Sequence, residues 1–292
     1  MKNEYEYKNL LVPVKHPDDV NRVTELSSVL LDKGRVTFLT VIKKGSFPSV
    51  QEDWRKSSRA IENYENKITS RKIRIMPKIR YSNSIWKGIV EQAEEDESDM
   101  ILMGWGRKIT FRSLRQTPVE NVLSHSDRDV VVFRNQDSNI TNTEKILLPV
   151  AYEDYDYSKR LSLVLQLIKS TGAECTLIHI LRKGHSREKV EKIFHGPRQY
   201  MKERGTECKT KIIENDNIPE ALIQESENYD LIVLGPTREY VFSRYMFGWL
   251  TDEIVNNAKC SSIVFKEAEL PWKAWIKGAI YGLGKELLNF FK

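Results

Sequence analysis

The residues best suited to chemistry lie in the stretch "ILMGWGRKITFRSLRQTP", residues 101–118. Two glycines are followed there by four cations: Gly104, Gly106, Arg107, Lys108, Arg112 and Arg115. Glycine lets backbone N–H groups approach a bound anion, and arginine binds phosphate through charge-assisted hydrogen bonds. The stretch therefore predicts a binding site for a nucleotide phosphate or another anion.

This loop belongs to a pattern that occurs twice in the chain. "DMILMGWGR" at 99–107 returns as "DLIVLGPTR" at 230–238, "KNLLVPV" at 8–14 as "KILLPVA" at 145–151, and "DVVVFR" at 129–134 as "SSIVFK" at 261–266. The polar stretch 135–143 between the copies has no apolar periodicity and is expected to be a linker. We therefore expect domains at 1–134 and 144–269, followed by a separate segment at 270–292.

Each copy alternates apolar runs with helical stretches. In the first copy we expect strands at 9–14, 36–42, 73–80, 99–104 and 129–133, and helices at 18–33, 52–70, 84–97 and 117–125. In the second copy we expect strands near 145–150, 174–181, 208–213, 230–235 and 261–265, and helices near 156–171, 186–204, 218–228 and 249–258. This alternation is typical of the α/β class and predicts two doubly wound domains, each with a five-stranded parallel sheet. The loop after the fourth strand would then lie at the carboxyl edge, where such sheets bind ligands.

The repeated first strand with its Pro-Val pair, the Asp-led strand ending in Gly, and the final Val-rich strand together resemble the universal stress protein (UspA-like) family over about 7–134 and 144–267. The start of the chain is also similar to the stress-protein modules associated with prokaryotic amino-acid transporters. The resemblance implies the adenine nucleotide alpha hydrolase-like sheet, commonly paired through edge strands. Two copies in one chain are expected to form that pair internally, and a homodimer is a further option. The ligand it implies is ATP or another adenine nucleotide, and the chain shows no other need for a cofactor.

ATP-binding members of that family have an Asp after the first strand and a loop of the form G-x2-G-x9-G-[ST]. Here Lys15 and Ala151 stand in the Asp positions, and neither side chain can accept a hydrogen bond from ribose. In the first loop Gln116 takes the place of the third glycine and Thr117 that of the hydroxyl residue; in the second loop Gly235, Arg238 and Gly248 take the three glycine positions. Val41, on the second strand, completes the set of candidate ligand contacts. Both sites are thus expected to be degenerate, and the first keeps the stronger positive charge.

Other chemistry finds little support in the sequence. The P-loop, H-E-x-x-H, C-x-x-C and G-x-S-x-G patterns are missing, so we expect no metal and no enzyme activity. His179 lies inside an expected strand and is interpreted as a core histidine. Nucleic-acid binding is not favoured, since a pI near 8.9 is weak support for it. Three scattered cysteines do not suit a disulfide framework and, with no signal-peptide pattern at the start, favour a cytoplasmic protein.

The segment "LPWKAWIKGAIYGLGKELLNFFK" at 270–292 predicts an amphipathic helix. Its apolar face would carry Trp272, Trp275 and Ile276 among others, and its polar face Lys273 and Lys277. Such a helix suits a membrane surface, a groove on a partner protein, or the chain's own domains. Binding to a membrane surface would give the protein a peripheral position at the inner face of the membrane.

From the sequence we expect a non-enzymatic stress-response or regulatory module with degenerate nucleotide or anion sites, recruited to a membrane or a transporter by its last helix. Two alternatives stay open. One is an ATP-binding stress protein with slow ATP hydrolysis. The other is a purely structural interaction protein whose pockets are filled by its own side chains.

Overall fold

The computed structural model describes residues 6–14, 17–44, 62, 72–104, 117–136, 139–184, 186–235 and 248–268; for 17–22, 248–250 and 252 it describes the backbone alone. In the first half the elements are β1 (Asn9–Pro13), α1 (Pro17–Leu30), β2 (Lys33–Lys43), β3 (Lys72–Ser82), α3 (Ile85–Glu95), β4 (Met100–Gly104), α4 (Pro118–His125) and β5 (Asp129–Arg134). A short 3-10 helix, η1 (Ile140–Asn142), connects the halves.

The second half repeats this order. Its elements are β6 (Lys145–Pro149), α5 (Ser158–Thr171), β7 (Glu174–Leu181), α6 (Arg187–Glu203), β8 (Cys208–Glu214), α7 (Ile218–Glu225), η2 (Ser226–Asn228), β9 (Leu231–Leu234), α8 (Gly248–Asn257) and β10 (Ser261–Lys266). The predicted α/β class and the repeated doubly wound arrangement are confirmed. The helices expected at 52–70 and 270–292 lie outside the described residues, apart from Glu62.

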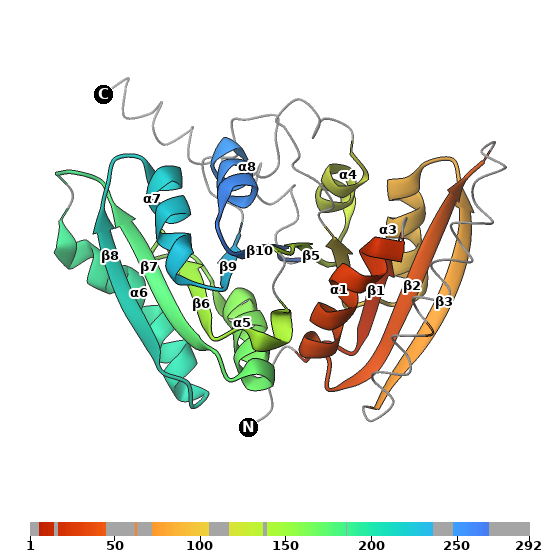
Figure 1. The fold of residues 1–292 in the computed structure, drawn as a ribbon, viewed down its shortest axis with the longest axis horizontal. Helices are drawn as coiled ribbons and strands as arrows, with labels where there is room; N and C mark the ends of the chain where they lie inside the picture. Colours follow the sequence, from red (N-terminus) through yellow and green to blue (C-terminus); the bar gives the residue numbers. More distant parts are fainter. Residues whose placement is uncertain are drawn as a thin grey trace, which may run out of the picture.

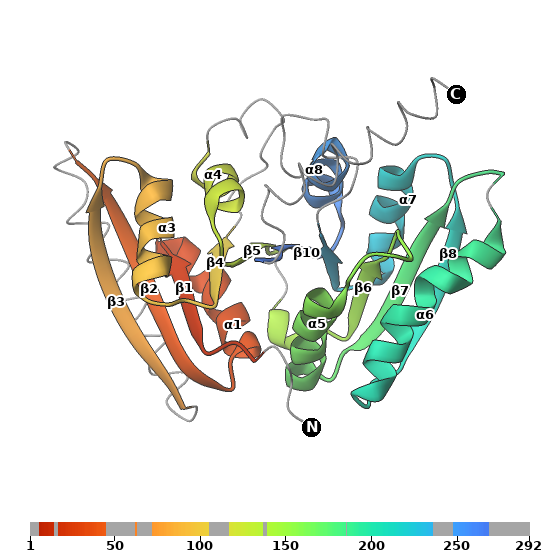
Figure 2. The same ribbon diagram turned by 180° about the vertical axis from the view of Figure 1, so that it is seen from behind.

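All ten strands form one sheet in the order β3-β2-β1-β4-β5-β10-β9-β6-β7-β8. Within each half the neighbouring strands are parallel, whereas β5 and β10 pair antiparallel at the centre, from Arg134 opposite Ser262 to Val130 opposite Lys266. Figures 1 and 2 show this pair of strands, the joint, between the two similar halves of the chain. The edge-strand pairing expected between the copies therefore occurs within the chain.

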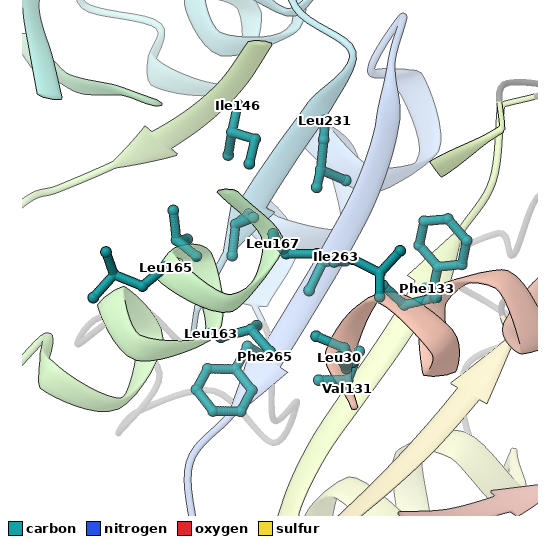
Figure 3. Packing of buried hydrophobic residues seen from close by; sticks show 14 of the residues in the cluster. Leu30, Val131, Phe133, Ile146, Leu163, Leu165, Leu167, Leu231, Ile263 and Phe265 are labelled. Atoms are coloured by element: carbon teal, nitrogen blue, oxygen red, sulfur yellow. The ribbon is translucent and has the colours of Figure 1, made fainter. Parts of the chain in front are cut away.

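The two faces of the sheet are covered by different helices. One core contains residues of α1, α5 and α6, and the other contains residues of α3, α4, α7 and α8. Strand residues alternate between these cores: Val131 and Phe133 of β5 belong to the first, and Val130 and Val132 to the second. Figure 3 shows the first core at the joint, where Ile263 and Phe265 of β10 lie near Leu163 of α5 and Leu30 of α1. Apolar burial on both faces explains the near-continuous apolar runs.

Two hydrogen bonds from cationic side chains also cross the joint. Arg134, at the end of β5, donates from Nη1 to the Ala258 carbonyl beyond the end of α8. Lys266, at the end of β10, donates to the Ser126 carbonyl beyond the end of α4. Free carbonyls at helix C-termini favour positive charge. Each half thus supplies a cation to the last helix of the other.

The repeated aspartates fasten the first strand of each half. Asp99 Oδ2 accepts from the backbone N–H groups of Lys8 and Asn9, at 2.6 and 2.8 Å. Asp230 Oδ2 accepts in the same way from Glu144 and Lys145, both at 2.9 Å. The Asp that precedes each fourth strand therefore fixes the start of the neighbouring first strand, so its repetition has a structural cause.

Replacing Asp230 by Ala leaves the N–H groups of Glu144 and Lys145 without this acceptor. We expect a loss of about 1–2 kcal/mol in the free energy of unfolding, since water can reach both donors. Asp230→Asn keeps an acceptor oxygen and should lose less, and Asp99→Ala should behave like Asp230→Ala. Urea unfolding measures these differences. Glu227→Ala, at an exposed position in η2, is the control and should stay within about 0.5 kcal/mol of the unchanged chain. An equal effect of Glu227→Ala would contradict the role assigned to the two aspartates.

Candidate functional site

In each half the strand order reverses beside the first strand, because β1 lies between β2 and β4, and β6 lies between β7 and β9. Helices that follow neighbouring strands cover opposite faces on either side of such a point, and a crevice forms beyond the carboxyl ends of the strands. In the second half this edge is formed by the residues after Pro149 of β6 and Leu234 of β9. The candidate site therefore begins there.

Several predicted site residues fall within the described part of the chain. Gly104 ends β4 and Gly235 follows β9, so both lie at this edge. Thr117 accepts from the Glu120 N–H at 3.2 Å and caps α4, and Gly248 begins α8. Val41 of β2 lies against α3, with its Cγ1 2.7 Å from where a Cβ on Gly88 would stand.

The other predicted residues lie outside the described part: Lys15, Gly106, Arg107, Arg112, Gln116 and Arg238. The convergence of cations expected in the first half therefore stays a prediction. The second half has a defined geometry on which a site can be built.

A cavity of about 310 Å³ opens at the carboxyl edge of the second half. This volume is near the lower end of the range of about 300–1,000 Å³ found for small-molecule sites. Residues from β6, β7, β9 and the helices α5, α7 and α8 line it, among them Ala151, Arg160, His179, Leu222, Gly235 and Ile254. His179 is half-buried and lines this cavity, so it is not the core histidine that was predicted, although its Nδ1 lies 2.8 Å from the Val150 carbonyl oxygen.

Arg160 is the buried cation of this cavity. It lies in the first turn of α5, and its side chain is only 5% exposed. The guanidinium lies over the rings of Tyr155 and Tyr157, at 5.3 and 5.4 Å from their centroids, and Nη2 donates to the Tyr155 hydroxyl at 3.1 Å. Nη2 also lies 3.6 Å from Glu267 Oε1, while Nε is buried with no hydrogen-bond partner among the described residues. The charge is thus compensated only in part.

The guanidinium rests directly on Gly235. A Cβ at that position would lie 1.8 Å from Arg160 Nη2 and 1.9 Å from its Cζ. In the first half, among the residues that the structure describes, a Cβ at Gly104 would meet the Cγ1 of Val23 alone, at 3.3 Å. Gly235 is therefore needed for close approach, and the group that approaches is a side chain of the same protein.

The backbone donors beside the cavity are also occupied. The Tyr157 hydroxyl accepts from the N–H groups of Ala151 and Tyr152, at 2.8 and 3.1 Å. Tyr157 is buried and makes an edge-to-face contact with Tyr155. Two donors at the end of the first strand of this half are therefore satisfied within the chain.

Glu267 links the cavity to the joint between the halves. It follows β10, and burial raises the pKa of its carboxyl to about 7, against the opposing effect of Arg160. Asp129 of β5 raises this pKa further. Asp129 in turn accepts from the Tyr7 hydroxyl at 2.9 Å and pairs with Lys159 of α5 at 3.4 Å. A buried chain of charges thus runs from the cavity to the central strands.

Arg160 was not among the site residues predicted from the sequence, although the sequence contains a signal for it. Arg160, Val164 and Leu167 share one helical stripe at spacings of four and three residues, and all three are buried. A cation on an otherwise apolar stripe indicates a buried partner. Within the described ranges, no cluster of three or more His, Cys, Asp or Glu side chains could hold a metal ion.

A family model described as the universal stress protein family matches residues 6–134 and 142–266. Among curated proteins, the Na+/H+ antiporter NhaS5 of Synechocystis sp. is 22% identical over 265 residues, which are 88% of this chain and 38% of the antiporter. The chain thus corresponds to well under half of that relative.

Solved structures with the same fold include a universal stress protein from Archaeoglobus fulgidus, with a TM-score of 0.67, 17% identity and coverage of 91% of this chain and 98% of the other. The cytoplasmic domain of a prokaryotic cation chloride cotransporter has a TM-score of 0.61 and 13% identity, over 90% and 96% of the two chains. Among the helices that the structure describes, none is sufficiently long and apolar to cross a membrane.

We expect Gly235→Ala to lower the free energy of unfolding by about 1–3 kcal/mol, because the new methyl group would displace the Arg160 guanidinium. Gly104→Ala is the matched control and should cost less than about 1 kcal/mol, since Val23 needs to move only slightly. Thermal and urea unfolding measure both.

The cause can be isolated in an Arg160→Ala background. In that background the added methyl group meets no guanidinium, so Gly235→Ala should lower the free energy of unfolding by less than about 1 kcal/mol, as expected for Gly104→Ala. A cost that is the same in both backgrounds would show that the contact between Arg160 and Gly235 does not explain the effect.

Proposed function

The chain belongs to the universal stress protein family, and from that premise we propose that it is a non-enzymatic regulatory module whose nucleotide sites are degenerate. In the second half, the groups that a nucleotide would need are used by the chain itself. The observation that carries this proposal is the contact of the Arg160 guanidinium with Gly235. The Arg160 guanidinium fills the space beside Gly235 that a phosphate would otherwise occupy.

Two further features of the second half support this proposal. Ala151 supplies no acceptor for ribose, and the Tyr157 hydroxyl occupies the backbone donors of Ala151 and Tyr152. The remaining cavity of about 310 Å³ is lined mainly by apolar side chains. Together these features disfavour a nucleoside triphosphate in the second half.

For the first half we propose an anion site that recognises phosphate groups but not the nucleoside. The sequence places Arg107 and Arg112 in the loop after β4, and Lys15 where a ribose acceptor would be needed. Arginine binds phosphate oxygens with paired donors, whereas lysine cannot accept a hydrogen bond from ribose. Such a site would bind ATP through its phosphates alone.

Calorimetric titration of the full chain with ATP, ADP, AMP and inorganic tripolyphosphate tests this proposal. ATP and tripolyphosphate should bind with dissociation constants within about threefold of each other, since nearly all affinity would come from phosphate contacts. Arg107→Ala/Arg112→Ala should weaken both about tenfold or more. Arg198→Ala/Lys202→Ala removes the same charge from the exposed face of α6 and should change little.

The other outcomes point to the two alternatives. Binding of ATP at least tenfold tighter than tripolyphosphate, with slow release of ADP, would establish an ATP-binding protein that hydrolyses its ligand. Failure of every ligand to bind, with an unchanged melting temperature, would favour a structural interaction protein. Either result would overturn the anion site proposed here.

We further propose that the module acts on a membrane transporter and reaches the membrane through residues 271–292. The relative NhaS5 is itself a Na+/H+ antiporter, of which the matching region is one part. In this chain, Trp272 and Trp275 alternate with Lys273 and Lys277 at helical spacing, as in helices that lie in the lipid interface. The described helices offer no alternative means of membrane attachment by spanning.

Sedimentation with anionic vesicles measures this recruitment. The full chain should bind vesicles of phosphatidylserine and phosphatidylcholine, and deletion of 271–292 should abolish binding. Replacing Lys273, Lys277, Lys285 and Lys292 by Gln should weaken binding by about a hundredfold or more, because each lysine contributes about 1 kcal/mol near an anionic surface. Neutral vesicles are the control. Equal binding by the chain without 271–292 would show that this segment is not the membrane anchor.

A further inference from the structure

Two of the three cysteines, far apart in sequence, face each other on neighbouring strands. Cys175 is the second residue of β7 and Cys208 the first residue of β8, and their Cα atoms are register partners in this parallel pair. Neighbouring strands are about 4.8 Å apart, within the range of about 4.4–6.8 Å that disulfides span between Cα atoms. The register therefore places the two Cα atoms within the range that a disulfide can span.

Both thiols also point to the same side of the sheet. Cys175 is buried in the core that contains α5 and α6, and Cys208 packs against the same core while half-buried. β8 ends the order of the described strands, so it has a strand neighbour on one side only. An outer strand can shift slightly toward its neighbour more readily than a central one, which would ease the formation of a bond between them.

The two sulfurs differ in reactivity. The Cys175 thiol hydrogen-bonds to Cys208, which raises the pKa of Cys175 and lowers that of Cys208. Since the thiolate is the reactive form, Cys208 is the better nucleophile and also the more accessible of the two. Cys260 offers an internal comparison, because it is buried in the other core and burial raises its pKa to about 12.

We propose that Cys175 and Cys208 form a reversible disulfide, with Cys208 as the residue that first reacts with a peroxide. The Cys208 thiolate attacks one oxygen of hydrogen peroxide, the O–O bond breaks, and the leaving hydroxide takes up a proton to become water. Cys208 is then a sulfenic acid. The Cys175 sulfur attacks the Cys208 sulfur, and the Cys175 proton leaves with the hydroxyl group as a second water.

The balance of this reaction is two thiols and one hydrogen peroxide giving one disulfide and two waters. The disulfide would tie the outer strand β8 to β7 and close the segment that contains α6. Such a link limits the unfolded chain and should raise the unfolding temperature of this part. A dithiol reductant would restore both thiols.

The test uses the full chain, fully reduced and then exposed to a small excess of hydrogen peroxide. After free thiols are blocked with iodoacetamide, intact mass and peptide mapping identify the products. We expect two alkylated cysteines fewer, a mass lower by about 2 Da before blocking, and a peptide that joins Cys175 to Cys208. Dithiothreitol should reverse all three changes.

Single variants separate the roles of the cysteines. Cys260→Ser should react like the unchanged chain. Cys175→Ser should stop at a Cys208 sulfenic acid, detected with dimedone at about tenfold the level in the unchanged chain. Cys208→Ser should consume peroxide much more slowly. If Cys175→Ser does not fold, Cys175→Ala replaces it, because alanine fits a buried apolar position.

Three results would overturn the proposal. One is a disulfide that includes Cys260, and another is a product dominated by links between two chains. The third is a Cys208 that stays sulfenic or unreacted in the unchanged chain while Cys175 remains a free thiol. The outcome does not depend on the anion site or on membrane binding, because it is read from the thiols alone.

Discussion

The antiparallel pairing of β5 with β10 is the constraint on which the rest of the molecule depends. Without it, each half would end in an exposed apolar strand, an arrangement that invites pairing with other chains. Within the chain, the pairing buries Val131 and Phe265 in the core that contains α1, α5 and α6, and it brings α1 against α5, where Ser170 donates to the Val29 carbonyl. It also lets Arg134 and Lys266 reach helix ends in the opposite half. One strand pair therefore makes the two repeats a single sheet.

The same joint determines the electrostatics of the candidate site. Glu267 follows β10 and therefore lies at the end of the joint. Its Oε1 is also 3.6 Å from Arg160 Nη2. Burying a carboxyl costs free energy, and the raised pKa of Glu267 shows that Arg160 offsets this cost only in part. Asp129, held by Tyr7 and Lys159, adds a second negative charge nearby. The cation in the cavity is thus held by residues that also join the halves.

The sequence was sufficient to predict the helices and strands that the structure describes and their repetition, because apolar runs and spacing are local. The strand predicted at 230–235 and the observed β9 at Leu231–Leu234 illustrate this agreement. What could not be predicted depends on contacts between distant residues. The repetition of Asp230 could be recognised in the sequence, but its hydrogen bonds to the N–H groups of Glu144 and Lys145 could be found only once the position of β6 was known. Arg160 could be placed on an apolar stripe, but its partner Glu267 is distant in sequence, and the pairing of Cys175 with Cys208 requires the strand register.

The two glycines at the ends of the fourth strands show why a motif alone does not identify a ligand site. The absence of a Cβ leaves space, but the space can admit a ligand or another part of the same chain. Among the described residues, the nearest neighbour of a Cβ at Gly104 is an apolar carbon at 3.3 Å, whereas at Gly235 a guanidinium already fills the space. Alanine at 235 would therefore conflict with the chain's own cation, whether or not any phosphate binds. The internal contact by itself accounts for a glycine at this position, so the chemistry of the second site has to be inferred from Arg160 and Glu267 rather than from the loop pattern.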